Sequence, residues 1–496
     1  MEQQLDTTSV TSVSPFMGNK INYGRKRIIL NYDKVTPENV MEVLQKAQNI
    51  FASNRKDCEY LIKYFLGEQD ILSRSYSPTS NINNRTVINY AYPITREIVG
   101  YTFGNKIELV QKNLNKVEEI TKVADIYDYE NAYYVDICTA IYASICGIGY
   151  QITLPSVDIN KDSTPEIPIT YNALDPRTTF VVQSSQIGNP QIMSCAISTN
   201  NENKKVYTCY TNEYKITITN MDANTMKIEK NLIGLDPITM VENSLFLTGD
   251  WEQAISVLNA INQVGSDALN DIEGTIRSLL VILGAEFGDD DDSDINKIKT
   301  QRILTLINKT GGNVDAKFIA PHLDSVSVEN LREYLDEARN VITGIPDRSA
   351  NSSGGDTGQA VLNRDGWTDM EIVARLKELF FKKAKKRQLA IGIKILQMLD
   401  FISKDLSILD IEPVIGRHTT DNLQTKTQAF STLVATGELA TIDCLELSNL
   451  TNRSREMVER GKQAKEEKMK EQEKLNPPNQ DNQDNEQKND NGNNEA

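Results

Sequence analysis

The sequence predicts an α+β protein in which long helices flank a central group of short strands. Between residues 150 and 243 the chain alternates β-branched runs with turns rich in Asn, Asp, Gly and Pro, a pattern typical of an antiparallel meander. On both sides of this region, apolar residues recur at helical spacing over long spans. Strands gathered in one region, and not alternating with helices, favour an α+β fold over a parallel α/β sheet.

Length and composition indicate a globular protein. The chain has 496 residues, of which 39% are hydrophobic and 25% are charged, and this length suggests roughly two or three domains. No apolar run approaches the ~20 residues of a membrane helix, so no membrane partner is expected. The polar and acidic first residues predict no signal peptide. The six cysteines are scattered without a CxxC motif, which predicts reduced thiols in a cytosolic compartment.

The formal net charge of -16 bears on nucleic-acid binding. Affinity for DNA comes largely from Lys and Arg, so this charge disfavours a protein whose main task is to bind phosphates tightly. A negatively charged wall repels the polyanion and keeps its contacts weak. The charge is therefore compatible with a protein along which DNA slides.

Four helices are expected before the central strands, and residues 1–35 should be poorly ordered apart from the basic–apolar run Arg25–Leu30. Thr36 should cap the first helix, because a proline follows it at the first helical position. The second helix should end near Gly67, and Pro93 should kink the third helix or mark its start. The four expected helical stretches are 36–50, 60–72, 87–104 and 125–147.

A long helix and a small unit are expected after the central strands. From Trp251 an apolar stripe of near-heptad spacing runs to Leu283 and predicts one helix, which an acidic run then ends. The expected small unit consists of a short helix at 294–299, a strand at 302–308, a Gly-Gly turn at 311–312 and a strand at 314–320.

The most informative stretch is a helix, a polar break and a second helix. The first helix should cover residues 325–344, with an apolar stripe at Val328, Leu331, Leu335, Ala338 and Ile342. Pro346 ends it, and four glycines up to Gly358 allow unusual backbone angles. The second helix should begin near Gln359. The break is either a tolerated surface excursion or a functional loop.

The C-terminal part should be helical and end in a disordered tail. One strand is expected at 406–417, and two or three helices between Thr420 and Arg460, broken near Gly437 and at 449–452. A charged helix follows, and the Asn/Gln/Asp-rich tail cannot bury a core.

No catalytic, cofactor or metal site is predicted. Only His322 and His418 are present, so a histidine triad or histidine metal cluster is nearly excluded. The sequence contains neither a GxxxxGK[ST] nor a GxSxG motif. The acidic run Asp289–Asp292 lacks EF-hand spacing, so a solvated loop is favoured, with a weak divalent-ion contact left open. A structural or binding protein is favoured over an enzyme.

A basic cluster lies on the second helix of the helix–break–helix stretch. We favour a solvated face with its aliphatic stems packed on the protein, and a patch facing phosphate or a partner is the alternative. The cluster comprises Lys382, Lys383, Lys385, Lys386 and Arg387.

The order of several stretches carries a family resemblance. A Tyr-rich helical region closes on Gly100-Tyr101 and Phe103-Gly104, a helix-to-strand passage contains an Asp-Pro turn, and a long helix precedes the helix–break–helix; these stretches are 60–74, 84–109, 146–151, 174–182, 249–273 and 344–361. Together they resemble the portal, or head-to-tail connector, proteins of tailed bacteriophages, in the class typified by long-tailed phages of Gram-positive bacteria. The residues at 357–361 depart from the Ser-Gly and aliphatic pair common in that family. Another ring-forming virion adaptor, or a nucleotide-dependent nucleic-acid enzyme, is the alternative.

The resemblance implies a portal fold with an α/β wing, a long-helix stem, a small α/β clip and an α-helical crown. The implied regions are a flexible arm at 1–35, the wing at 36–250 and 359–417, the stem at 251–286 and 324–344, the clip at 287–323, a tunnel loop at 345–358, the crown at 418–470 and a disordered tail at 471–496.

The resemblance also implies a function, partners and site residues. Twelve subunits would form a ring at one capsid vertex, in the host cytoplasm during assembly and then in the virion, and would nucleate the procapsid. Implied partners are the terminase large subunit, a head-completion or adaptor protein, the major capsid and scaffolding proteins, and double-stranded DNA passing through the channel. The DNA-proximal loop residues would be Arg348, Ser349, Asn351, Ser352, Ser353, Gly354, Gly355 and Asp356; the channel-facing stem residues Glu329, Glu333, Asp336 and Glu337; and the clip residues that contact motor or adaptor Asp289, Asp290, Asp291, Asp292, Lys297, Lys299 and Arg302.

Overall fold

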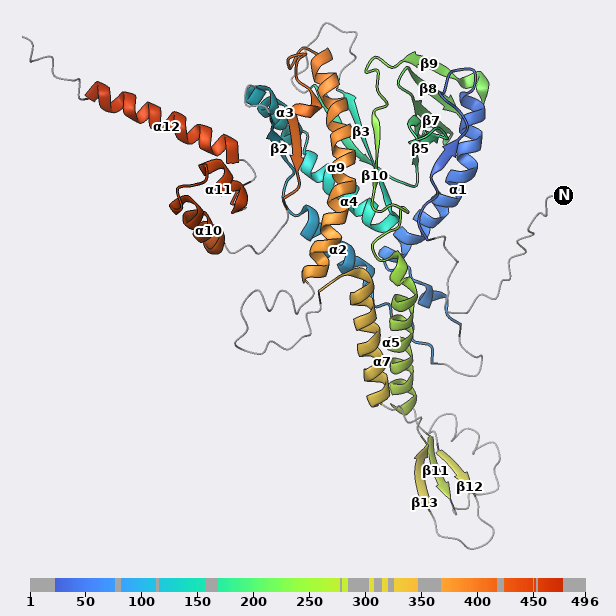
Figure 1. The fold of residues 1–496 in the computed structure, drawn as a ribbon. Helices are drawn as coiled ribbons and strands as arrows, with labels where there is room; N and C mark the ends of the chain where they lie inside the picture. Colours follow the sequence, from blue (N-terminus) through green and yellow to red (C-terminus); the bar gives the residue numbers. More distant parts are fainter. Residues whose placement is uncertain are drawn as a thin grey trace, which may run out of the picture. The chain divides into compact units, whose positions relative to one another are not determined.

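The computed structural model has the mixed helix-and-sheet composition that the sequence predicts (Figure 1). It divides the chain into two compact units, one of residues 1–111 and 116–418 and one of 112–115 and 419–496. It describes residues 23–75, 82–112, 116–156, 168–276, 279–283, 303–306, 315–319, 325–346, 367–416, 423–448, 450–451 and 454–475.

The first predicted helices form one continuous element, α1 (Val40–Phe65). The predicted cap at Thr36 is wrong: the Thr36 carbonyl accepts from the Asn39 and Val40 backbone N–H groups in a turn that precedes the helix. The predicted division between two helices is also wrong. Asn54, between the two predicted helices, bonds both the N–H and the carbonyl of Lys26 through its side chain, at 2.9 and 2.8 Å. Its side chain thus holds the N-terminal segment that contains β1 (Ile28–Leu30).

Helix α2 (Ala91–Phe103) begins four residues after the start of the expected stretch, with Pro93 in its first turn, so the proline marks the start of the helix, one of the two predicted outcomes. The single helix expected over 125–147 is instead two, α3 (Val117–Tyr129) and α4 (Ala132–Cys146). The chain turns between them at Asn131, whose φ of 52° is left-handed and therefore incompatible with a continuous α-helix.

The central strands are confirmed, but they form two sheets. Five consecutive strands make an antiparallel meander, to which β1 adds in parallel beside β5, giving the order β1-β5-β6-β7-β8-β9. A separate sheet has the order β10-β3-β4, in which β3 pairs with both β4 and β10, a strand that the sequence reading missed. The bounds are β3 Ile148–Pro155, β4 Ile169–Leu174, β5 Thr179–Ser184, β6 Gln191–Thr199, β7 Lys205–Tyr210, β8 Tyr214–Thr219, β9 Lys227–Lys230 and β10 Ile238–Glu242.

The long helix predicted to reach Leu283 is shorter. Helix α5 covers Ile255–Ile276, and Leu279–Leu283 is a strand, β11. This strand lies between β12 (Ile303–Leu306), to which it is parallel, and β13 (Asp315–Ile319), to which it is antiparallel. An unbroken run of Leu, Val and Ile suits a central strand with neighbours on both edges. The two predicted strands are therefore confirmed, and the predicted short helix and the Gly-Gly turn fall outside the described residues.

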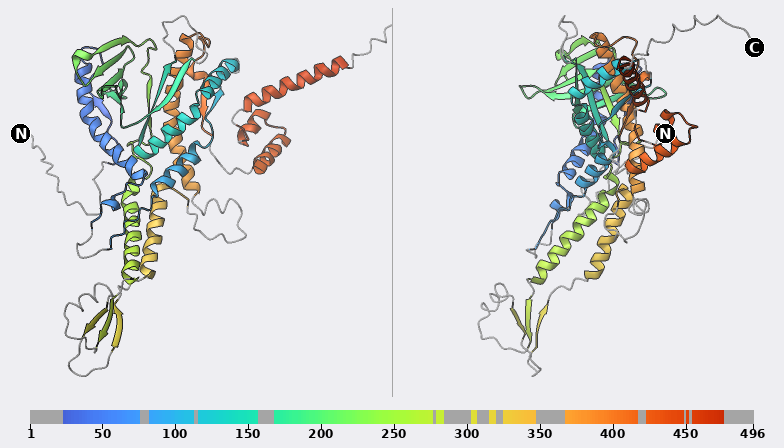
Figure 2. Two further views of the ribbon diagram at one scale, coloured as in Figure 1. Left: turned by 180° about the vertical axis from the view of Figure 1, so that it is seen from behind. Right: turned by 90° about the vertical axis from the view of Figure 1, so that its left-hand side faces the viewer.

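Helix α7 (Ser325–Thr343) is confirmed and packs beside α5 (Figure 2). Of its predicted apolar stripe, Leu335 is buried in the cluster that holds Leu258 and Ile261 of α5, whereas Leu331 and Ile342 stay about half exposed in the single chain.

The second helix of the pair, α9 (Trp367–Met398), is also confirmed, and its predicted start near Gln359 lies outside the described residues. The predicted strand at 406–417 is shorter than expected. Only β14 (Ile411–Val414) is extended, and it pairs with β2 (Glu108–Gln111). A 3-10 turn precedes it, closed by a capping box of Ser407 and Asp410.

The second unit contains the predicted C-terminal helices, α10 (Leu423–Ala435), α11 (Thr441–Leu447) and α12 (Ser454–Leu475). In the first unit, the largest core cluster surrounds Trp251, just before α5. Its ring stacks on Tyr64 of α1 at 5.4 Å between centroids, and its Nε1–H donates to Thr95 of α2 at 3.0 Å. The start of α5 is thereby fixed to two other helices.

Candidate functional site

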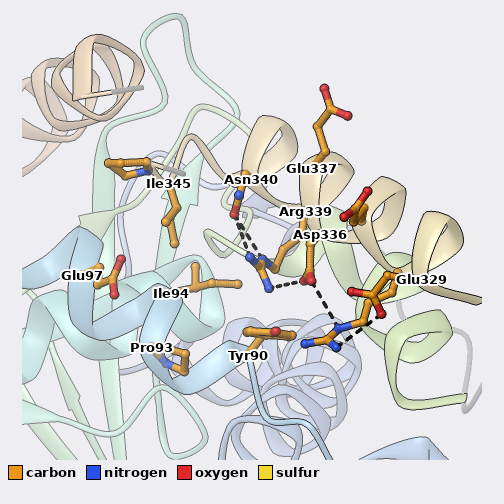
Figure 3. A pocket seen from close by; sticks show the side chains of 13 residues that line it. Tyr90, Pro93, Ile94, Glu97, Glu329, Asp336, Glu337, Arg339, Asn340 and Ile345 are labelled. Atoms are coloured by element: carbon orange, nitrogen blue, oxygen red, sulfur yellow. Dashed lines mark hydrogen bonds and ion pairs between the residues drawn. The ribbon is translucent and has the colours of Figure 1, made fainter. Parts of the chain in front are cut away.

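The predicted channel-facing carboxylates lie together on α7 and line a cavity between α7 and α2. The cavity has a volume of about 650 Å³, and Glu97, Tyr90 and Ile94 of α2 or its approach form the opposite wall. Figure 3 shows Glu329, Asp336 and Glu337 along this side of α7. The carboxylates Glu329, Glu333 and Glu337 recur every four residues, a spacing that places them on one helix face.

The four carboxylates are not equivalent. Glu333 and Glu337 are exposed, and the Glu329 side chain is 60% exposed. Asp336 is only 28% exposed and pairs with Arg339 at 2.6 Å. Asp336 therefore differs from the other three carboxylates, because an arginine one turn along the helix holds it.

Arg339 is the central contact of the site, although the sequence reading did not single it out. Its guanidinium carbon lies 3.9 Å from the centroid of the Tyr90 ring, a cation–π geometry. Its Nε and Nη2 donate to the Asn340 side chain at 3.2 and 2.9 Å, and its Nη1 donates to Asp336 (Figure 3). Arg339 thus ties α7 to the residue that precedes α2. The only signal in the sequence was an arginine three residues after an aspartate.

The two ends of the break between α7 and α9 are anchored. Gly344 has a φ of 69° and donates its N–H to the Asn340 carbonyl at 2.8 Å, so it closes α7 as a left-handed glycine. A Cβ at Gly344 would lie 2.8 Å from a methyl group of Val373 on α9. Ile345 packs on the core that surrounds Trp251, and Pro346 is buried.

At the other end of the break, Trp367 packs on α2. Its ring lies 5.8 Å from that of Tyr101, and the Tyr101 hydroxyl donates to Glu371 at 3.0 Å. The end of the break at Trp367 is therefore fixed to α2, and the end at Gly344 lies against α9. The predicted loop residues Arg348, Ser349, Asn351, Ser352, Ser353, Gly354, Gly355 and Asp356 lie outside the described residues, as do the clip residues Asp289, Asp290, Asp291, Asp292, Lys297, Lys299 and Arg302.

The basic cluster on α9 mainly forms ion pairs with other parts of the chain. Lys385 is buried and forms an ion pair with Asp136 of α4 at 2.8 Å. Asp136 also accepts from Gln151 at 3.0 Å and from the Tyr171 hydroxyl at 2.7 Å. Burial, with the Asp136 charge second, raises the pKa of Tyr171 well above its ordinary value. The favoured interpretation of a solvated face is wrong for Lys385.

Three other lysines of the cluster also have partners within the chain. Lys382 and Lys386 reach Glu412 at 3.5 and 2.9 Å, and Lys383 reaches Glu242 at 3.8 Å. The alternative of a patch facing phosphate therefore has little support in the described residues. Lys377 adds a second buried pair with Asp250, at 2.6 Å. These pairs attach α9, and with it one end of the break, to the sheet β10-β3-β4 and its flanking helix α4.

Within the described residues, no group of three or more His, Cys, Asp or Glu side chains is arranged to hold a metal ion. No helix in the described ranges is both long and apolar enough to span a bilayer.

Comparison with known proteins identifies the family. The sequence matches the phage portal protein family described as SPP1 Gp6-like over residues 44–474. The chain belongs to this family. The portal match spans α1 to nearly the end of α12 and includes both helices of the helix–break–helix. The chain is accordingly a bacteriophage portal, or head-to-tail connector, protein, a structural component of the virion.

Other comparisons are weaker than the portal family match. Among solved structures, a chain of the "Neck of native GTA particle computed with C12 symmetry" is similar, with 11% sequence identity and a TM-score of 0.45. The similarity covers 80% of this portal chain and 94% of the other. No curated protein matches the sequence.

Proposed function

We propose that this portal chain forms a ring of twelve subunits at one capsid vertex and that double-stranded DNA passes along the ring axis during packaging and ejection. The family match over residues 44–474 is the observation that carries the proposal. A ring requires a heterologous interface, in which one face of each subunit packs on a different face of the next. The paired helices α5 and α7 are suited to side-by-side packing around an axis.

The regions take the following parts in this proposal. Residues 36–250 and 359–417 form the wing, α5 and α7 the stem, residues 345–358 the tunnel loop, and residues 418–470 the crown. Because β11 pairs with β12 and β13, we place the clip from β11 to β13, with the stem helix ending at Ile276 and not at 286. Residues 1–35 would be an arm and 471–496 a tail.

The acidic row of α7 would face the channel. Glu329, Glu333 and Glu337 present three carboxylates on one helix face, and a ring would repeat them around the axis. Carboxylates repel phosphates and keep DNA from adhering to the wall. Asp336 would instead hold Arg339 and so fix the base of the tunnel loop.

The tunnel loop would make brief contacts with the DNA backbone. Its residues from Arg348 to Asp356 are one arginine, one alanine, two glycines and five short polar residues. Contacts to phosphate carry no sequence information, which a channel for a whole genome requires. Anchors at Gly344 and Trp367 would let the loop move while its ends stay in place.

The clip would bind the terminase large subunit during packaging and the head-completion protein afterwards, through the acidic run Asp289–Asp292 with Lys297, Lys299 and Arg302. The wing and crown would meet the major capsid and scaffolding proteins, and the ring would nucleate procapsid assembly in the host cytoplasm. The ring would be a passive channel without a cofactor or an ATPase activity of its own.

Electron microscopy of the purified full-length chain tests the proposal. We expect rings of twelvefold symmetry with a central channel wide enough for a DNA duplex. A chain that stays monomeric under all assembly conditions would contradict it. ATP hydrolysis by the purified chain, with no other protein present, would contradict the proposal of a passive channel.

A further inference from the structure

Two buried cysteines face each other across the six-stranded sheet. Cys195 on β6 is the register partner of Cys209 on β7, in an antiparallel pairing that runs without a bulge from Ser194–Tyr210 to Thr199–Lys205. Direct opposition puts both side chains on the same face of the sheet. Both belong to the core cluster that this sheet forms with α1.

The position in the ladder decides how close the two sulfur atoms come. The Asn200 N–H donates to the Lys204 carbonyl at 3.0 Å at the end of the hairpin, so this pair is hydrogen-bonded. Hydrogen-bonded and non-hydrogen-bonded pairs alternate along an antiparallel ladder. Five steps along, the Cys195–Cys209 pair is therefore a non-hydrogen-bonded one, the kind whose side chains approach more closely.

This spacing matches what a disulfide needs. Cα atoms of a non-hydrogen-bonded pair lie about 4.5 Å apart, and disulfides span Cα separations of about 4.4–6.8 Å. The backbone would not have to move to form the bond. A second facing pair, Cys58 and Cys146, lies between helices α1 and α4, where no ladder sets the distance between backbones.

The surroundings of the pair determine which oxidants can act. Both side chains are completely buried, with Phe180 and Ile216 beside them on the neighbouring strands. Burial, followed by the hydrogen bond to Cys209, raises the pKa of the Cys195 thiol. Because burial lowers the fraction of thiolate, the pair reacts slowly even with a small oxidant, and a bulky disulfide reagent cannot enter. The pair should therefore remain reduced in the host cytosol.

We propose that Cys195 and Cys209 are a disulfide-forming pair that closes when the protein meets a small peroxide in oxidising surroundings. One thiol gives up its proton and its sulfur attacks a peroxide oxygen; the O–O bond breaks, the proton joins the leaving hydroxide, and a sulfenic acid and a water molecule result. The second thiol attacks that sulfur, the S–O bond breaks, and a second water leaves. Two thiols and one hydrogen peroxide thus give one disulfide and two waters. Closure would follow release of the virion. This timing rests on the proposed function, whereas the formation of the disulfide does not depend on it.

Peptide mapping tests the proposal directly. The intact protein is treated with hydrogen peroxide, its remaining thiols are alkylated in denaturant, and it is digested with trypsin. Cleavage at Lys and Arg places Cys195 in peptide 178–204 and Cys209 in peptide 206–215, each with a single cysteine. We expect most of both alkylated peptides to disappear and a linked species, two hydrogen atoms lighter than their sum, to replace them. Dithiothreitol should restore both.

Two further measurements keep the test independent of folding defects and of ring assembly. Oxidation should raise the thermal midpoint of the wild type, because the bond closes a loop in the unfolded chain, and Cys209→Val should abolish the rise while Cys444→Ala retains it. Repeating the oxidation in urea below the unfolding transition lets the sheet open. Full recovery of both alkylated peptides at every such concentration, or linkage of Cys195 to another cysteine, would overturn the proposal. Rings seen by microscopy would be unaffected by either result.

Discussion

Replacing Lys385 by Met should destabilise the first unit far more than replacing its neighbour Lys383 by Met. Lys385 is the cation of a buried pair in which its own side chain is 3% exposed and that of Asp136 is 4% exposed. The methionine fills a similar volume but leaves the Asp136 carboxylate without its counter-charge.

The cost follows from what remains around Asp136. Removing one partner of a buried ion pair costs about 3–5 kcal/mol, because an uncompensated charge stays buried. Gln151 and Tyr171 still donate to the carboxylate, at 3.0 and 2.7 Å. We therefore expect the lower part of that range, about 3 kcal/mol of unfolding free energy. Lys383 is 77% exposed and 3.8 Å from Glu242, so its loss should cost less than about 0.5 kcal/mol.

Chemical denaturation followed by tryptophan fluorescence measures the difference. Trp251 lies in the core of the first unit and reports its unfolding. Combining Lys385→Met with Asp136→Asn should recover most of the loss, because the amide oxygen still accepts from Gln151 and Tyr171 without carrying a charge. A Lys385→Met variant as stable as Lys383→Met, with an unchanged dependence on denaturant, would refute the argument from burial.

Four further predictions concern the loop and the channel face. Gly344→Val should lower the free energy of unfolding by about 1–3 kcal/mol in chemical denaturation, because φ at this position is positive and Val373 is too close. Gly100→Ala, in open space on α2, should instead raise the free energy of unfolding by about 0.5–1 kcal/mol. Equal effects of the two changes would contradict this. Arg339→Met should speed amide hydrogen exchange at residues 340–345, and Arg332→Met, at an exposed position, should not. Unchanged protection in both variants would refute the anchor. Replacing Gly354 and Gly355 by proline should impair DNA packaging while rings still form, and replacing both by alanine is the control. Normal packaging by the proline variant would contradict the tunnel-loop assignment. Replacing Glu329, Glu333 and Glu337 by lysine should make rings retain DNA in a salt-dependent way, and more strongly than replacing them by glutamine. Equal retention by the two variants would place this face away from the channel.

The local periodicity of the sequence was enough to predict several elements. Helix α7, its end at Gly344, and the strands β5 to β9 each depend on patterns within a few residues, and all of these are found. These elements are predictable because the spacing of their apolar side chains selects the backbone conformation. The order of these patterns also carried the portal resemblance, which the family match confirms.

Periodicity failed where a distant part of the chain decides the outcome. Asn54, in the middle of α1, bonds the backbone of Lys26, and Leu279–Leu283 is a strand because it pairs with β12 and β13, which come later in the sequence. Local spacing reveals neither contact. The site shows the same limit: the acidic row was predicted, but the stacking of Arg339 on Tyr90 was not.

The sequence by itself therefore determined the class of protein, the acidic helix face and the place of the break, because each is encoded in composition or in local spacing. Only the tertiary structure decided that Lys385 is buried against Asp136, that Arg339 anchors the loop base, and that Cys195 faces Cys209. A charged or sulfur-bearing side chain is stable in a core only beside its partner, and that partner becomes its neighbour only once the chain has folded.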